Sequence, residues 1–295
     1  MKTTNNKSGL IGTAVVLMIL LAACIAVDAA LPSYHIAITV IKKATVYSLV
    51  AVSMNLLNGF TGLFSLGQAG FMLLGAYSYA ILTIPVAKRA GVYQYFDGGW
   101  VQFSLPEIFS GALGDTVGSV VGMLLALLVG GILAAIVAYL IGLPVLRLKS
   151  DYLAIATLGF AEIMRAIIQW KQVGPLTNAS NLLKKFANFD SILFPFVVSA
   201  ICIGFIVLLI NSTYGRAFKA IREDEVAAEA MGINLAKHKR MAFCISSFFA
   251  GVGGGLFAMF ANQAQAKTFT TSMTYEILLI VVIGGIGSIS GSCIA

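Results

Sequence analysis

Residues 214–232 read YGRAFKAIREDEVAAEAMG, a charged segment that lies between two strongly apolar stretches of the chain. Asp224 is placed to cap a helix start with its carboxylate, Glu225 falls in the first turn, and Gly232 can adopt the left-handed conformation that ends a helix. The helix so defined has about two turns and is too short to be stable alone in water. We therefore predict a short helix that packs on the protein's own membrane face or on a separate soluble subunit.

The composition outside this segment is that of a membrane protein. Hydrophobic residues make up 59% of the 295 positions and charged residues 11%, and the mean hydropathy is +0.94, values outside the range of soluble globular domains. The net charge of +7 is not accompanied by basic clusters interleaved with aromatic residues, so we expect no nucleic-acid binding. The prediction is an all-α, polytopic protein in contact with lipid, with residues 1–295 forming a single transmembrane domain.

Apolar windows near the spanning length of about 20 residues predict the helices. There are eight, at about 10–31, 37–57, 67–85, 118–141, 153–170, 192–211, 241–261 and 276–295. With the N-terminus inside, the basic residues of 142–152 and of the 212–240 loop fall on the inner side, as the positive-inside rule requires. Others fall near the outer side and weaken that orientation: Lys42, Lys43, Lys88, Arg89, Lys184 and Lys185.

Both ends of the sequence raise a question of processing. Lysines at positions 2 and 7 and the LAAC motif at 21–24 resemble a signal peptide with a lipoprotein box. Because the apolar run continues past Cys24 to Leu31, we favour an uncleaved first span. The sequence ends at Ala295 within an apolar stretch, and we expect the native C-terminus to lie further on.

Glycine-rich patches recur at 59–70, 251–255 and 284–291. Small residues let membrane helices approach closely, so tight packing explains all three. The first patch and the residues before it also hold polar side chains at membrane depth, which indicates a broken or re-entrant helix. Packing and the lining of a translocation path both remain open for it, and the candidate path residues are Asn55, Ser65 and Gln68.

Glu162 and Arg165 stand three positions apart within a predicted span and can form an intramembrane ion pair. The pair either neutralises two charges and locks a helix, or takes part in substrate passage or gating. An ion-coupled transporter normally has a richer chain of buried carboxylates or histidines. The sparseness of such groups disfavours that class.

No catalytic or metal-binding pattern is present in the sequence. His35 and His238 have no partner at a useful spacing, and Cys24, Cys202, Cys244 and Cys293 occur singly in apolar runs. Phosphate-loop, zinc-helix and nucleophile-elbow motifs are all missing. We therefore expect no enzyme activity, metal or cofactor in this chain. If ATP drives the protein, a different chain must bind it.

The charged segment carries the features of a docking element. Phe218, Ile221, Ala228 and Met231 would form one apolar stripe if a helix ran through the segment. A solvated loop would need neither the cap nor the terminating glycine, so docking in a partner's groove is favoured. The candidate coupling residues are Arg216, Phe218, Ile221, Arg222, Glu223, Asp224, Glu225, Ala227, Ala228, Met231 and Gly232.

Four stretches resemble the membrane permease subunits of bacterial ABC importers for branched-chain amino acids, specifically the second of their two permease types. They are SMNLLNGFTG at 53–62 with SLGQA at 65–69, GLPVLRLKSDYLAI at 142–155, residues 215–232, and GGIGS at 284–288. The most specific is REDEVAAEAMG at 222–232. Departures from the family pattern are Ser150 and the sequence Ala179-Ser180-Asn181, which puts contact with a binding protein in question.

The resemblance implies a permease of the bacterial inner membrane that moves leucine, isoleucine, valine or another small amino acid. It implies a heterodimer with a second permease, two cytoplasmic ATP-binding subunits and an external substrate-binding protein. Residues 216–232 would be the coupling helix, with the charged residues at 222–225 in polar contact and Ala227, Ala228 and Met231 in packing contact with the ATPase. The alternatives are an ion-coupled secondary carrier or channel that needs no ATPase, and a membrane enzyme acting on lipid.

Overall fold

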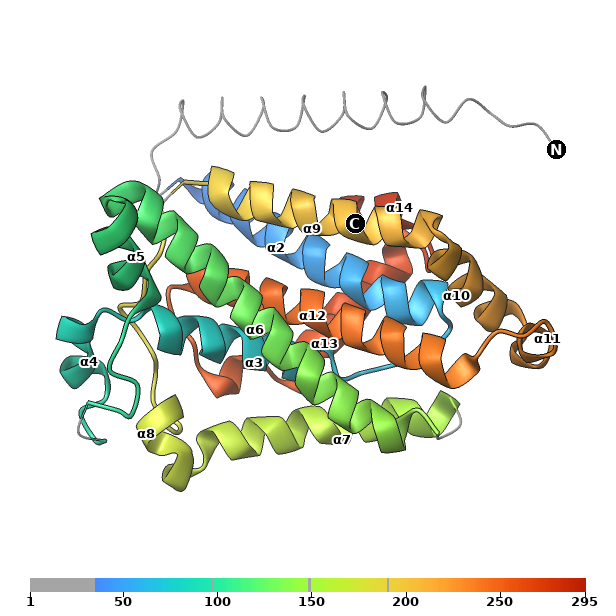
Figure 1. Cartoon of the computed structure of the whole chain (residues 1–295), viewed down its shortest axis with the longest axis horizontal. Helices are drawn as coiled ribbons and strands as arrows, with labels where there is room; N and C mark the ends of the chain where they lie inside the picture. Colours follow the sequence, from blue (N-terminus) through green and yellow to red (C-terminus); the bar gives the residue numbers. More distant parts are fainter. Residues whose placement is uncertain (1–34, 97, 148–149, 190) are drawn as a thin grey trace.

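The computed structural model describes residues 35–96, 98–147, 150–189 and 191–295, and these residues are all-α apart from one antiparallel bridge between Leu183 and Ala264. The long helices α2, α6, α9 and α12 run along the length of the molecule, with α6 inclined to the others (Figure 1). The predicted first span at 10–31, Cys24 and the signal-peptide alternative lie outside the described residues.

Five helices of the described part are long and apolar enough to cross a membrane. They are α2 (Ile36–Asn55) with its continuation η1 (Leu56–Phe60), α6 (Asp115–Val145), α7 (Ser150–Gln169), α9 (Leu193–Asn211) and α12 (Leu235–Ala261). Each coincides with one of the predicted apolar windows. The prediction of an all-α polytopic membrane protein is confirmed.

The predicted window at 67–85 forms α3 (Gln68–Thr83), a helix of 16 residues. At about 1.5 Å per residue, it is shorter than a hydrocarbon core of about 30 Å. Nearly every residue of α3 is buried, because α6, α7 and α12 pack around it. The window is therefore helical but does not form a full, lipid-facing span.

The prediction of a single span at 276–295 is wrong. The structure has two helices there, α13 (Thr271–Gly284) and α14 (Ile289–Ile294). Gly285 and Gly287 between them have φ values of 95° and 82°, in the left-handed region where glycine is favoured. A Cβ at Gly291 would overlap the carbonyl oxygen of Gly284, so the two helices touch backbone to backbone across this turn.

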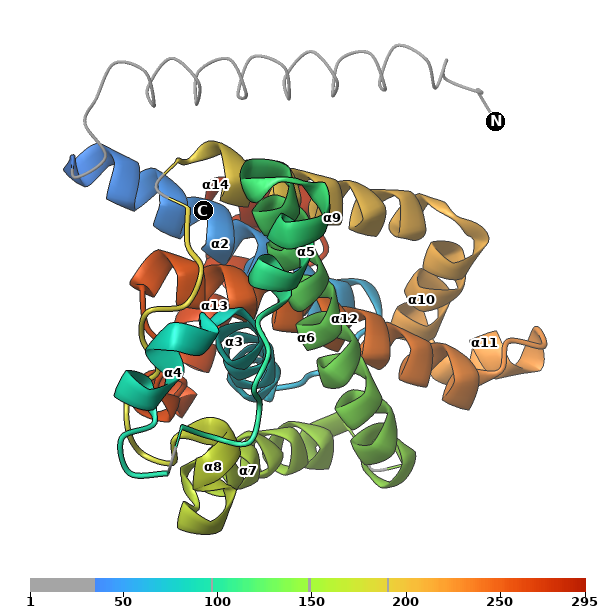
Figure 2. The same ribbon diagram turned by 60° about the vertical axis from the view of Figure 1, so that its left-hand side comes forward.

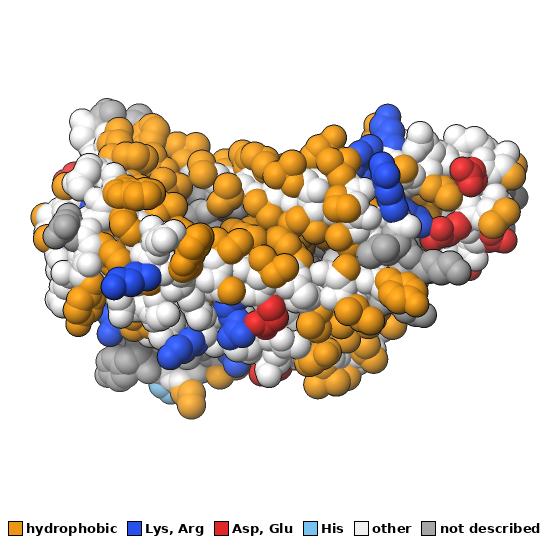
Figure 3. All heavy atoms as spheres, turned by 90° about the horizontal axis from the view of Figure 1, so that it is seen from below, with side chains coloured by type: hydrophobic (Ala, Val, Ile, Leu, Met, Phe, Trp, Pro, Cys, Tyr) orange, Lys and Arg blue, Asp and Glu red, His pale blue; other side chains and the backbone are white. Residues whose placement is uncertain are grey.

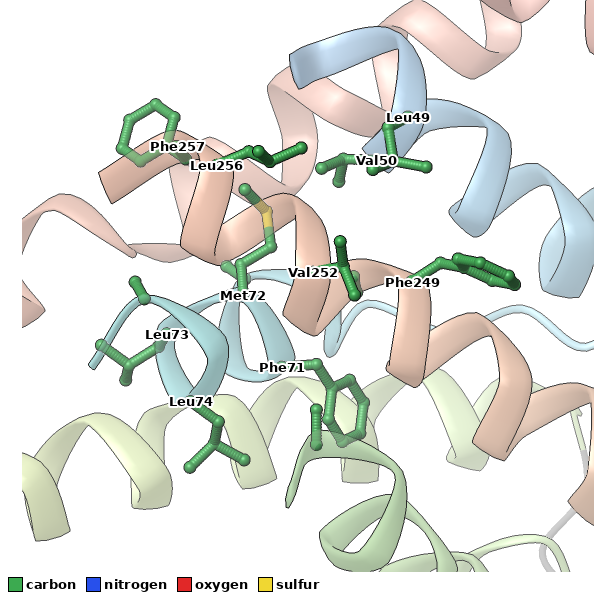
Figure 4. Close-up of a cluster of buried hydrophobic side chains, with 14 of the residues drawn as sticks. Leu49, Val50, Phe71, Met72, Leu73, Leu74, Phe249, Val252, Leu256 and Phe257 are labelled. Atoms are coloured by element: carbon green, nitrogen blue, oxygen red, sulfur yellow. The ribbon is translucent and has the colours of Figure 1, made fainter. Parts of the chain in front are cut away.

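The hydrophobic core lies where α12 passes between α2 and α3, and Figure 4 shows Val252 and Leu256 of α12 among side chains from both neighbours. A Cβ at Gly75 of α3 would overlap the carbonyl oxygen of Gly251, and one at Gly254 would overlap that of Met72. Close packing is thus confirmed for the 251–255 patch, because glycine allows the two backbones to meet.

Short elements occupy the two ends of the bundle. At one end lie α4 (Val86–Val92), α5 (Leu105–Leu113), η2 (Lys171–Val173) and α8 (Gly174–Thr177), and near the bridge lies η3 (Ala266–Thr268). At the opposite end, α10 (Thr213–Glu223) and α11 (Glu225–Ala230) connect α9 to α12 and project beyond the other helices (Figures 1 and 2). We refer to these as the α4 end and the α11 end.

Arg89 on α4 is a buried cation at the α4 end, with only 2% of its surface exposed. Its Nη2 donates to the carbonyl oxygens of Ile81, at 2.7 Å, and Phe103, at 2.6 Å. Burial lowers the pKa of the guanidinium, and the nearby Tyr93 and Glu107 oppose that shift. Arg89 therefore ties the last turn of α3 to the segment that precedes α5.

Candidate functional site

The charged segment at the α11 end folds as two helices joined at Asp224. The Oγ of Ser212 caps α10 by accepting from the backbone N–H of Tyr214 at 3.2 Å. Asp224 has an extended backbone, φ −157° and ψ 112°, and its Oδ1 accepts from Val226 N at 2.8 Å and Ala227 N at 3.1 Å. Gly232 follows α11 with φ 83°. The predicted cap and the predicted terminating glycine are both confirmed.

The prediction of one continuous apolar stripe is wrong, because the break at Asp224 turns the two helices relative to each other. Phe218 and Ile221 of α10 are buried against the bundle, and Ala228 of α11 is 4% exposed. Met231, the fourth member, is 83% exposed. The three buried side chains hold the segment to its own chain and cannot contact a partner in this conformation.

The surface of α11 that faces away from the bundle is formed by other residues. Val226 is 79% exposed, and Ala227, Glu229 and Ala230 lie on the same open surface. The remaining predicted coupling residues are also exposed: Arg216, Arg222, Glu223, Asp224, Glu225 and Gly232. Glu225 is paired with Lys239 of α12 and Glu223 with Arg222. We call Val226, Ala227, Glu229, Ala230 and Met231 the α11 surface.

Arg222 connects this segment to the interior of the bundle. Its Nη1 donates to the carbonyl oxygen of Gly59 at 2.9 Å. Gly62 allows the approach, because a Cβ there would lie 3.0 Å from Cγ of Arg222, and its φ is 74°. Lys219 of the same helix places its Nζ 5.7 Å from the centre of the Phe60 ring. Two basic residues of α10 therefore contact the segment in which α2 ends.

The predicted broken helix is present at that segment. After Asn55 the backbone widens into the π-helical turn η1, residues 61–67 are not helical, and α3 begins at Gln68. The chain thus turns back toward the bundle between α2 and α3 (Figure 1). Non-helical backbone inside a membrane protein is tolerated only where protein or water satisfies it. Here the N–H of Leu66 donates to the Thr157 hydroxyl of α7 at 3.0 Å.

The three candidate path residues are all buried. Asn55 and Ser65 are 0% and 2% exposed and Gln68 is 3% exposed. Gln68 Nε2 donates to the Ser53 hydroxyl at 2.7 Å, and the N–H of Ser65 donates to Asn58 Oδ1 at 3.1 Å. In this conformation they support the backbone around the break, and their side chains reach no open surface.

Asn55 also links the break to the turn between α13 and α14. Its Nδ2 donates to the Ser292 hydroxyl at 2.7 Å and to the Ser288 carbonyl at 2.9 Å, and its Oδ1 accepts from Gly287 N at 2.8 Å. The amide therefore uses both its donor and its acceptor sides on one turn. The two interrupted regions of the chain, which are distant in sequence, are joined through this side chain.

The predicted intramembrane ion pair is formed. Arg165 donates from Nε to Glu162 Oε2 at 2.9 Å and also contacts that oxygen through Nη2. The other carboxylate oxygen, Oε1, accepts from the hydroxyl of Thr271, the first residue of α13, at 3.0 Å. The pair thus bridges α7 and α13, and about a third of each charged side chain is exposed.

The described residues contain no group of three or more His, Cys, Asp and Glu side chains that could hold a metal ion. Cys202, Cys244 and Cys293 are free thiols. The contacts that sequence reasoning missed are Arg222 with Gly59 and Glu162 with Thr271. Both join segments far apart in the chain, and neither has a periodic or spacing signal that a single sequence would reveal.

Comparison with known proteins gives one family. Residues 36–295 match the model of the branched-chain amino acid transport system permease component. The high-affinity branched-chain amino acid transport system permease protein LivM of Salmonella typhimurium is 30% identical over 275 residues, and its Escherichia coli counterpart gives the same identity. In both cases the match covers 82% of this chain and 57% of the relative.

A more distant relative is named LivH and not LivM. The probable branched-chain amino acid transport permease protein LivH of Methanocaldococcus jannaschii is 26% identical over 262 residues, which is 86% of this chain and 76% of the relative. No solved structure matches the chain at a significant level. This chain therefore spans little more than half the length of the two LivM proteins.

Proposed function

This chain belongs to the family of branched-chain amino acid transport permeases, and from that premise we propose that it is one membrane subunit of an ATP-driven importer. The observation that carries the proposal is the capped helix α11, which projects beyond the bundle and is connected through Arg222 to the break after α2. A projecting helix with a link to an interrupted span is suited to transmit movement from a partner.

The α11 surface is the site at which an ATP-binding subunit would dock. Val226 and Met231 are large apolar side chains with 79% and 83% of their surfaces exposed, and the small side chain of Ala227 leaves space for a groove to close over the helix. An amphipathic helix that enters a groove uses this combination of apolar anchors and small residues. Glu229 adds a negative charge for a basic group of the partner.

Movement would reach the transmembrane region through hydrogen bonds. Arg222 holds the Gly59 carbonyl, and four positions earlier Asn55 holds the turn at Gly287. A tilt of α10 therefore pulls on the end of α2 and, through Asn55, on the start of α14. Both are places where the helix is already interrupted, so they bend at lower cost than a continuous helix.

The remaining parts of the proposal follow the family. The chain would sit in the bacterial inner membrane, pair with a second permease, receive a branched-chain or other small amino acid from an external binding protein, and contact two ATP-binding subunits. It would act as the M type of permease, without catalysis, metal or cofactor of its own. ATP hydrolysis would take place in the partners.

The test compares two alanine-to-arginine variants in the complete importer. Ala227→Arg places a charge on the α11 surface, whereas Ala90→Arg changes an exposed residue of α4 at the opposite end. We expect the first to abolish co-purification of the ATP-binding subunit and leucine uptake, and the second to leave co-purification intact. Ala228→Arg is a poorer test, because Ala228 is buried in its own chain.

Reconstitution of the chain alone distinguishes the importer from the rival explanation, an ion-coupled carrier or channel that needs no ATPase. Vesicles that contain only this polypeptide should accumulate no leucine under a proton or sodium gradient, and the full complex should do so only with ATP. Gradient-driven uptake by the single chain would establish a self-sufficient secondary carrier and contradict the proposal. Normal uptake by Ala227→Arg in the complete importer would contradict docking on the α11 surface.

A further inference from the structure

The ion pair of Glu162 and Arg165 lies well inside a membrane-spanning helix. Glu162 is seven residues before the end of α7 at Gln169, which corresponds to about 10 Å along the axis. The face of the molecule along which α7 runs carries hydrophobic side chains together with several basic groups (Figure 3). Exposed neighbours on α7 include Ile155 and Ile163. Arg165 is four residues, or about 6 Å, from the same helix end, so the pair occupies the half of α7 nearer to the α4 end.

Partial exposure of these charges has a consequence for what covers them. The side chain of Glu162 is 36% exposed and that of Arg165 31%. A charged residue facing lipid at the centre of a bilayer costs about 2.5 to 3.5 kcal/mol by insertion measurements. A partly exposed charge pair within a spanning helix is therefore more stable against water or polar groups than against lipid tails.

The two side chains retain hydrogen-bonding capacity in this arrangement. Arg165 uses Nε and Nη2 on Glu162, and among the described residues its Nη1 has no partner. The Glu162 carboxylate accepts from Arg165 and Thr271 and can accept further bonds, since two carboxylate oxygens offer about four sites. One donor and one acceptor of opposite charge are thus available side by side on the open flank of α7.

We propose that Glu162, Arg165 and Thr271 form a transient binding site for the charged end of a zwitterionic α-amino acid during its passage. The substrate carboxylate binds Nη1 of Arg165, and its ammonium group binds the Glu162 carboxylate next to the Thr271 hydroxyl. An α-amino acid presents these two charges on one carbon atom, so its charge pattern complements the pair. The inference rests on the proposed importer function and adds the position of a substrate site.

A shallow depression of the surface lies beside the site. The next turn of α7 toward the α4 end borders a hollow lined by Ala166, Ile167, Gln169, Trp170 and Ser180. This hollow is open to the outside of the chain and combines apolar with polar side chains. An amino acid with a branched apolar side chain would find contacts for both of its parts between the hollow and the ion pair.

The first test neutralises both charges together in the complete importer. Glu162→Gln with Arg165→Gln keeps two hydrogen-bonding side chains at the same spacing and removes the cost of buried charge, so a merely structural pair would be replaced without loss. We expect normal assembly and ATP hydrolysis with leucine uptake reduced about tenfold or more, because charge-assisted hydrogen bonds to the substrate are lost. Uptake at the wild-type rate would overturn the proposal.

The matched control lies on α13. Thr271→Val removes the hydroxyl without changing the shape of the side chain, and Ser272→Ala removes the exposed hydroxyl next to it. Uptake should fall only for Thr271→Val. Equal effects of the two substitutions would assign the loss to α13 itself and contradict a role of Thr271 in binding.

The second test asks whether the site binds a zwitterion in preference to a molecule with a single charge. In a Ser272→Cys complex, a water-soluble thiol reagent should label position 272, which is exposed and directly follows Thr271, with the unsubstituted complex as background for the native cysteines. Leucine should slow the labelling severalfold, and isopentylamine and 4-methylpentanoate, with one charge each, should not. Absence of labelling, or equal protection by all three compounds, would exclude the site.

These outcomes are separable from failure of the proposed function. If the wild-type complex takes up leucine without ATP or without the ATP-binding subunit, the importer proposal fails. If the wild-type complex behaves as an importer and the doubly neutral variant equals it, only the substrate site is wrong.

Discussion

Arg222 on α10 donates a hydrogen bond from Nη1 to the carbonyl oxygen of Gly59, 2.9 Å away, although 163 positions separate the two residues. The bond joins the projecting segment at the α11 end to the point where α2 loses its regular helical form. A side chain that holds a carbonyl at a helix break fixes the break in one geometry. The contact is therefore the first place to look for mechanical coupling.

Replacement of Arg222 should separate ATP hydrolysis from transport. In Arg222→Met the α11 surface is unchanged, so the ATP-binding subunit should still co-purify, but the Gly59 carbonyl loses its partner and leucine uptake should fall at least severalfold. Lys237→Met, which removes an exposed lysine at the start of α12, is the control. Leucine uptake and ATP hydrolysis are measured on the same vesicles. Normal uptake by Arg222→Met would show that the bond between Arg222 and Gly59 is dispensable.

Asn55 should be a structural residue and not a solute contact. Asn55→Leu would leave the Gly287 N–H without its acceptor, at about 1 to 3 kcal/mol for a buried group that remains unpaired. It would also remove the Asn55 bonds to the Ser292 hydroxyl and the Ser288 carbonyl, which remain bonded to each other. We expect a clearly lower midpoint of thermal unfolding in detergent. Asn211→Leu, at the exposed end of α9, should leave the midpoint within about a degree of wild type, since exposed substitutions are usually within about 0.5 kcal/mol.

A glycine pair provides the sharpest packing test. Gly75→Ala would place a methyl group on the Gly251 carbonyl and force α3 and α12 apart, whereas Gly159→Ala in α7 meets nothing within 4 Å. The first should greatly reduce the yield of monodisperse protein. The second should preserve or raise it, because alanine is favoured over glycine inside a helix by about 1 kcal/mol. Size-exclusion profiles of the two variants give the answer, and similar profiles would contradict the packing described for α3.

Arg89 should require its guanidinium geometry and not merely its charge. Lysine carries a single ammonium group on a shorter reach, so Arg89→Lys cannot span the carbonyl oxygens of Ile81 and Phe103 in the same way. We expect loss of stability in Arg89→Lys, read from the midpoint of denaturant unfolding in detergent. Lys88→Arg, at the exposed neighbouring position, should have no effect. Wild-type stability of Arg89→Lys would mean that charge alone is sufficient.

The sequence was informative where local chemistry decides the structure. The cap at Asp224, the terminating Gly232 and the pairing of Glu162 with Arg165 all depend on residues within a few positions, and each was confirmed. The last predicted span failed because hydropathy averages over Gly285 and Gly287, whose positive φ values turn the chain back. An apolar window indicates burial in lipid or in protein and does not indicate the direction of the chain.

The burial of individual residues was harder to predict. Periodicity placed Phe218 and Met231 on one stripe, but the extended backbone at Asp224 puts the first inside the bundle and leaves the second 83% exposed. Asn55 and Gln68 are polar residues at membrane depth, and polarity alone did not distinguish a path lining from internal hydrogen bonds. Those distinctions depend on contacts between distant segments, which one sequence does not encode in any local pattern.

The position of α3 constrains how the protein is made. Its surface is complete only when the glycine-rich stretch of α12 has arrived against it, and α12 starts at Leu235, about 150 residues after α3 ends at Thr83. A ribosome that adds about 5 to 20 residues per second therefore leaves α3 without its neighbour for roughly ten seconds or more. During biogenesis this short helix therefore remains at the insertion machinery or in an incomplete bundle until α12 is inserted. Mutations in α12 should first affect this step of assembly.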